Sequence, residues 1–184
     1  QQASILLPCQ YRSDPYVADR GMTMSVFSHL DDSGRPVMVD VGKKKPTLRE
    51  AEAEALVRLS RKVLDSMIEG KNAKGDVLRV AEIAGIMGAK RTPELVPLCH
   101  SIRLDHVSVV CELDEIEATA RVRCTARGTE VTGVEMEAMT GVSVAALTLY
   151  DMCKGIDKGI TIERIRLLRK SGGRSGEYRA EDRV

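Results

Sequence analysis

Residues 134–154 restrict the fold of this chain more than any other segment, because they are apolar on every side of a helix. Between Val134 and Lys154 most residues are Ala, Val, Leu or Met. A helix at the surface carries a single apolar stripe, whereas one that is apolar all round has to be covered by other parts of the protein. We therefore predict a helix here that is buried on more than one side.

The residues on either side of this helix follow the period of a β-strand. From Arg103 apolar and polar positions alternate, and they alternate again after an acidic turn. Strand side chains point alternately to the two faces of a sheet, so the two runs predict an antiparallel hairpin. A further strand is expected from Ile160 to about Leu168. The apolar positions of the hairpin are Val107, Val109, Cys111, Leu113, Ala118, Ala120, Val122 and Cys124.

The first half of the chain predicts helices after a short strand over residues 36–41. Thr47 and Glu50 match a T-x-x-E capping box, and apolar residues recur at helical spacing until Gly70, which predicts a helix. Asp76 can cap a second helix. Its expected apolar face is Val77, Val80, Ala81, Ala84 and Met87. Gly85 and Gly88 should let another backbone come close. A short helical turn is expected to start at Thr92.

These elements predict one α+β domain with an antiparallel sheet packed against helices. A length of 184 residues suits a single domain. Residues 22–184 are expected to form it, with a natural start at Met22 or Met24. Residues 1–21 show no periodicity, and we expect them to be a disordered or added tail.

Composition excludes several classes of function. Lys and Arg total 28 against 27 Asp and Glu, so no global field attracts the protein to nucleic acid or to a membrane. Aromatic residues make up 3%, which argues against an RNA-recognition sheet because such sheets stack bases on aromatics. No apolar run of about eighteen residues and no signal peptide is present, and the five scattered cysteines suit reduced thiols. We expect a soluble, cytoplasmic protein.

Charged residues at the ends of the apolar helix are the first candidates for a site. Asp151 and Lys154 lie one helical turn apart, which suits either an ordinary salt bridge or a half-buried lysine used for proton transfer. Glu135 and Glu137 lie near the start of the helix. They either complement its dipole or act as a base or a substrate-orienting carboxylate.

Two basic clusters suggest recognition of an anion. Lys170 and Arg174 flank glycines in the sequence KSGGRSG, and glycines let successive backbone N–H groups turn toward one anion. Lys43, Lys44, Lys45 and Arg49 form the second cluster, and together the two would suit a polyphosphate. Lys74 and His100 are weak candidates taken alone, and the adjacent Cys99–His100 pair has poor spacing for a metal, so no metal site is expected.

Several long blocks of this sequence resemble the MoaC family in their order and spacing. They are MVDVGKK with TLREAEAEA, KGDVLRVAEIAGIMGAKRTPELVPLCH, TGVEMEAMTGVSVAALTLYDMCKG and RLLRKSGGRSGEY. The resemblance runs from about Met38 to Tyr178. It implies a ferredoxin-like subunit and a homo-hexamer, a trimer of dimers with active sites at subunit interfaces. It also implies a lyase of molybdenum cofactor biosynthesis that converts a cyclic dihydro-GTP, made by a radical-SAM cyclase, into cyclic pyranopterin monophosphate and pyrophosphate.

The resemblance also implies roles for individual residues. Lys74 and Lys154 are the expected proton-transfer pair, with Asp151 orienting Lys154. No redox cofactor is implied, although a divalent cation could accompany the triphosphate. The other expected site residues are Glu135 and His100 beside the purine-derived ring, and Asp40, Lys44, Arg49, Met136 and Lys170 toward substrate or phosphates.

One loop departs from the family pattern. Many members read G-K-T-G before V-E-M-E, whereas this chain carries Thr129-Glu130-Val131 before Thr132-Gly133 and lacks the lysine. The alternative function that the sequence leaves open is a non-catalytic nucleotide-sensing module, because ferredoxin-like sheets also serve as binding domains. A sensor would need phosphate and base contacts but no lysine–carboxylate pair, and it would release its nucleotide unchanged.

Overall fold

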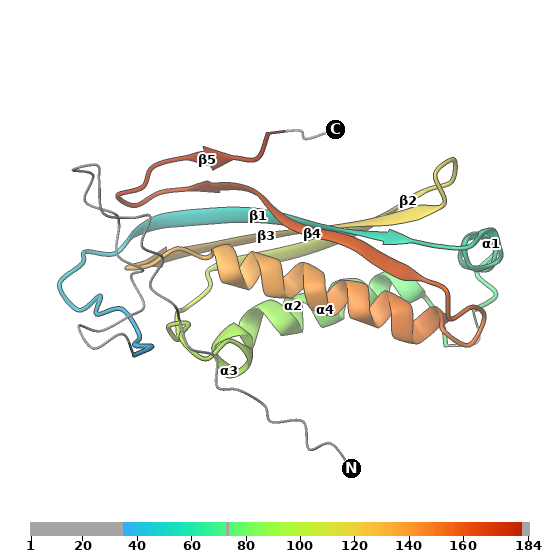
Figure 1. Ribbon diagram of the computed structural model, residues 1–184, viewed down its shortest axis with the longest axis horizontal. Helices are drawn as coiled ribbons and strands as arrows, with labels where there is room; N and C mark the ends of the chain where they lie inside the picture. The colour runs from blue at the N-terminus through green and yellow to red at the C-terminus, as the bar shows by residue number, and fades with distance from the viewer. Residues whose placement is uncertain (1–34, 73, 182–184) are drawn as a thin grey trace, which may run out of the picture. The chain divides into compact units, whose positions relative to one another are not determined.

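The computed structural model describes residues 35–72 and 74–181. Figure 1 shows one antiparallel sheet with helices α2 and α4 against one of its faces. The strands lie in the order β2-β3-β1-β4-β5. The elements are β1 (Thr47–Arg58), α1 (Arg61–Ile68), α2 (Val77–Lys90), α3 (Thr92–Leu95), β2 (His106–Asp114), β3 (Thr119–Glu130), α4 (Glu135–Cys153), β4 (Thr161–Ser171) and β5 (Tyr178–Arg179).

The α+β prediction is confirmed, and the topology is ferredoxin-like. Without the short edge strand β5, the chain runs strand, helices, strand, strand, helix, strand, and β1 and β3 occupy the centre of the sheet. Every strand pair is antiparallel. The predicted hairpin is β2 and β3, and the strand predicted after the apolar helix is β4. None of the helices in the described part of the chain is long and apolar enough to span a membrane.

The helix predicted from the capping box at Thr47 is wrong: residues 47–58 form the central strand β1. The alternation of alanine and glutamate decides its conformation. Alanines at 51, 53 and 55 are buried against the helical layer, while the glutamates of β1 point to the other face of the sheet. There Glu54 pairs with Arg164 and Arg166 of β4, at 2.9 and 2.8 Å. Partners on the neighbouring strands therefore override the helical propensity of Ala and Glu.

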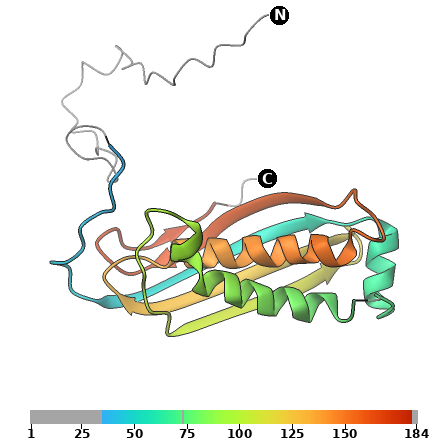
Figure 2. The same cartoon turned by 90° about the horizontal axis from the view of Figure 1, so that it is seen from below.

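Helix α4 is buried on two sides, as predicted. It covers β1, β3 and β4 with one face and packs along α2 with another, and Figure 2 shows the two helices side by side. Their backbones approach closely at Gly85 of α2. A Cβ atom there would lie 2.9 Å from the carbonyl oxygen of Gly141 in α4. The predicted role of Gly85 is confirmed.

Other local predictions have mixed outcomes. Asp76 caps α2 as expected, because its Oδ1 accepts a hydrogen bond from the Arg79 N–H at 3.1 Å. The predicted apolar face of α2 is partly wrong: Val80 and Met87 are exposed, at 40% and 50%. The strand predicted over residues 36–41 is also wrong, because residues 37–46 lie outside the regular elements. The predicted tail, residues 1–21, lies outside the described residues.

The described cysteines are free thiols. Cys111, Cys124 and Cys153 are buried, and Cys99 is half-buried. Burial raises the pKa of the Cys111 and Cys124 thiols to about 12. These thiols therefore stay protonated and behave as small core residues.

Candidate active site

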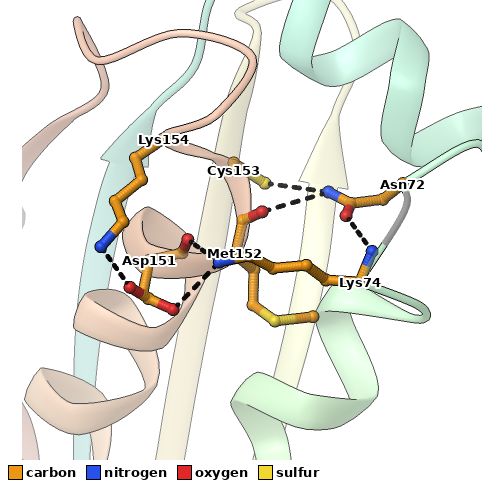
Figure 3. A network of polar contacts seen from close by, with 6 residues as sticks. All are labelled: Asn72, Lys74, Asp151, Met152, Cys153 and Lys154. Atoms are coloured by element: carbon orange, nitrogen blue, oxygen red, sulfur yellow. Dashed lines mark hydrogen bonds and ion pairs between the residues drawn. The ribbon is translucent and has the colours of Figure 1, made fainter.

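Three of the predicted site residues meet where α4 ends. The turn before α2 brings Lys74 to Asp151, and Lys154 reaches the same carboxylate from the other side (Figure 3). Lys154 Nζ lies 2.6 Å from Asp151 Oδ1, and Lys74 Nζ lies 3.3 Å from Oδ2. Lys74 Nζ also donates to the backbone carbonyl of Asp151 at 2.8 Å. One carboxylate therefore holds two ammonium groups.

This group is more exposed than the sequence suggested. In the chain by itself all three residues are exposed, with side-chain exposures of 48% for Lys74, 59% for Asp151 and 49% for Lys154. The hydrogen bond to Lys154, followed by that to Lys74, lowers the pKa of Asp151. The hydrogen bond to Asp151 raises the pKa of Lys154, so the expectation of desolvation is wrong for the isolated chain.

Residues from both basic clusters line one cavity, which suits the polyphosphate hypothesis, but Lys170 is not among them. The cavity measures about 410 Å³ and is lined by the lysines of residues 43–45, by Arg49 and by Arg174. The lysines and Arg174 are exposed. Asp40 Oδ1 accepts a hydrogen bond from the Gly42 N–H at 2.8 Å, which shapes the turn that carries the lysines. Convergent cations around a cavity suit phosphate oxygens.

Arg49 and Lys170 hold the loops around this cavity. Arg49 donates from Nε to the Glu130 carbonyl at 3.3 Å and from Nη2 to the Val131 carbonyl at 3.5 Å. Its guanidinium also packs against Gly173. Lys170 Nζ contacts Ser175 within the glycine loop. The loop that departs from the family pattern thus lies against Arg49 through its backbone, which needs no lysine side chain.

His100 and the start of α4 lie near the same end of the sheet as the basic cavity. His100 Nε2 bonds to the Val39 carbonyl at 2.8 Å, so Nε2 carries the proton in this contact. This links the segment after α3 to the residues just before Asp40. Glu135 is half-buried in the first turn of α4, and Met136 is 42% exposed.

Glu137 is the site candidate that sequence reasoning ranked too low. It is only 3% exposed and lines a cavity of about 370 Å³ together with Lys90 and His106. Burial raises its pKa to about 7, and the nearby charge of Glu135 adds to this effect. An interaction with the helix dipole does not require burial, so it does not explain why Glu137 is buried. The sequence holds no local signal for this burial, because a glutamate in the first turn of a helix fits an exposed position equally well.

The predicted residues form two groups that one chain does not bring together. Lys74, Asp151 and Lys154 lie at the end of the sheet where β1 finishes and α4 ends. The basic cavity and Glu135 lie at the opposite end, where β1 begins, as its pairing with the last residues of β3 shows. Glu135 and Asp151 are roughly 24 Å apart along α4, at about 1.5 Å per residue.

Comparison with known proteins agrees with the sequence blocks. A family model described as the MoaC family matches residues 38–173. A cyclic pyranopterin monophosphate synthase of Pelobacter propionicus is 60% identical over 156 residues, which cover 85% of this chain and 98% of that protein. Synthases of the same name from Geobacter sulfurreducens and a Roseiflexus species are 54% and 56% identical, with 85% and 84% of this chain covered and 98% of each relative. Because the family model and these relatives both span most of the chain, it belongs to the MoaC family.

Proposed function

We propose that this protein is a cyclic pyranopterin monophosphate synthase, a lyase of molybdenum cofactor biosynthesis. The observation that carries the proposal is the pairing of Lys74 and Lys154 with one carboxylate, together with a separate cavity lined by five cationic side chains. The first group suits proton transfer and the second suits a triphosphate. Family membership and the names of the relatives support the same reaction.

The substrate in this proposal is a cyclic dihydro-GTP. A hydroxyl group of the substrate attacks the α-phosphorus, the bond from that phosphorus to the bridging oxygen breaks, and pyrophosphate leaves. The proton of the hydroxyl passes to a base, for which Lys74 and Lys154 are the candidates. Asp151 orients Lys154, while Glu135 and His100 position the ring. Asp40, Lys44, Arg49, Met136 and Lys170 contact the substrate or neutralise charge on its phosphates.

The separation of the two groups supports a site shared between copies of the chain. A homo-hexamer built as a trimer of dimers would place the lysine–aspartate group of one copy beside the basic cavity of another. The exposed side chains of Lys74, Asp151 and Lys154 would then be covered by the neighbouring copy. The same proposal includes a cytoplasmic protein that needs no redox cofactor, with a divalent cation optional on the triphosphate and a radical-SAM cyclase supplying the substrate.

Incubation of the purified protein with the cyclic dihydro-GTP tests this function. Pyrophosphate and the fluorescent oxidised pterin are measured, with Lys154→Ala as the matched inactive variant. A synthase forms both products, and the variant forms neither. A nucleotide sensor, the rival function, would bind the compound and return it unchanged, and that result would contradict the proposal.

A further inference from the structure

The turn that carries Lys74 is fixed by the side chain of Asn72. Asn72 Oδ1 accepts a hydrogen bond from the backbone N–H of Lys74 at 2.9 Å. The backbone carbonyl of Asn72 accepts a second bond, from the Gly75 N–H at 3.0 Å. Gly75 adopts a φ of +92°, which favours glycine, and Asp76 then caps α2. The position of the Lys74 backbone therefore follows from Asn72.

The same side chain also attaches this turn to α4. Asn72 Nδ2 donates to the Met152 carbonyl at 3.4 Å and lies 3.8 Å from Cys153 Sγ (Figure 3). The carbonyls in the last turn of a helix have no partner inside the helix. Lys74 Nζ satisfies the carbonyl of Asp151, and Asn72 satisfies the next one. Two residues of one turn thus cap two successive carbonyls of α4.

We propose that Asn72 is a positioning residue that holds Lys74 against Asp151 during turnover, an inference that rests on the proposed function. When Lys74 gives up a proton, its amine loses the charge attraction to Asp151. The Asn72 amide is uncharged and keeps its contacts with α4 in both states of the lysine. Only a side chain with an acceptor and a donor can bind the Lys74 N–H and the Met152 carbonyl together.

Two substitutions separate these contacts. Asn72→Asp has nearly the same shape and keeps the acceptor for the Lys74 N–H, but it loses the donor and puts a negative charge at the negative end of α4. Asn72→Ala loses both contacts. We expect kcat to fall by about ten- to a hundredfold in each, with KM within about threefold of the parent, because both changes act on the proton-transfer group and leave the basic cavity as it is. Lys71→Ala is the matched control, since Lys71 is exposed and pairs with Glu69.

A second measurement needs no turnover. In protein labelled with 13C-lysine, the side-chain resonance of Lys74 reports its contact with Asp151. We expect Asn72→Asp and Asn72→Ala to move that resonance as Asp151→Asn does, and Lys71→Ala to leave it in place. The inference is overturned if both Asn72 variants keep kcat within about twofold of the parent, or if the resonance stays in place in both. A parent without activity would refute the proposed function, while the resonance would still decide the role of Asn72.

Discussion

Lys154 and Asp151 form an ion pair across the last turn of α4, with 2.6 Å between Nζ and Oδ1. The contact raises the pKa of the lysine and lowers that of the aspartate. Lys74 reaches the same carboxylate from a turn 77 residues earlier in the sequence. The state of charge of Lys154 therefore depends on Asp151, and both lysines contact the same carboxylate.

Asp151→Asn tests this dependence through the pH profile of kcat. The amide cannot stabilise the ammonium of Lys154 as the carboxylate does, so the pKa of Lys154 falls. The limb of the profile that belongs to Lys154 should move to lower pH, whether the lysine acts as acid or as base, and kcat should fall by about a hundredfold. The measurement is kcat from pH 6 to about pH 10 for both proteins. A profile of unchanged shape would refute the link between the two residues.

Glu137→Gln should change how stability depends on pH. The buried carboxyl has a pKa of about 7 in the folded chain and 4.5 as its ordinary value, so the folded state binds more protons between these values. The free energy of unfolding therefore falls as pH rises through this window, by about 3 kcal/mol from Glu137 alone. The glutamine variant lacks this loss and should be the more stable protein at pH 8.

Urea unfolding at pH 5 and pH 8 measures the difference, at one protein concentration for both proteins. Other titrating groups cancel when the two proteins are compared. An equal change with pH in parent and variant would show that Glu137 is ionised without cost in the folded state.

Gly85→Ala tests the contact between α2 and α4. The added Cβ would lie 2.9 Å from the Gly141 carbonyl oxygen and 3.1 Å from Ala145 Cβ. Overpacking costs about 1–3 kcal/mol, and the better helix propensity of alanine offsets up to about 1 kcal/mol of it. We expect a net destabilisation in thermal unfolding. Gly155→Ala is the control, because a Cβ there meets nothing within 4 Å, and equal effects of the two would argue against close packing.

Lys44→Ala tests the basic cavity. Removing one cation should raise KM by about tenfold and change kcat less, because the phosphates are bound before and during the reaction. Added salt should reduce the difference from the parent, since salt screens exposed charges. Steady-state kinetics at low and high salt measure both effects, with Lys71→Ala as the control. A loss confined to kcat would place Lys44 in the chemical step instead.

Elements whose conformation depends on local sequence were predicted correctly, and elements that depend on contacts with distant residues were not. The hairpin was predicted correctly because its period is local and regular, and α4 because its apolar residues form one continuous run. Strand β1 was not, because Ala and Glu favour helices in isolation, and the partners of Glu54 lie on a strand more than a hundred residues later. Val80 and Met87 have the spacing of a buried face, yet α4 packs on the glycine side of α2.

In the candidate site too, the contact between neighbours on one helix was predicted, and contacts formed only by the tertiary structure were not. Asp151 and Lys154 were paired correctly from their spacing on one helix, and the two basic clusters were expected to serve one anion. The contact between Lys74 and Asp151 follows from tertiary structure alone. The burial of Glu137 does as well, since its sequence position fits an exposed first turn equally well.

The most direct test of the account is activity in a mixture of two inactive variants. Lys154→Ala disables one end of the chain, and Lys44→Ala combined with Lys170→Ala disables the other when the substrate is kept below the parental KM. If copies share sites, dissociating and reassembling the mixture should restore up to about a quarter of parental turnover, as random pairing in symmetric dimers predicts. Turnover that stays at the level of the separate variants would contradict a site built from the two ends of different chains.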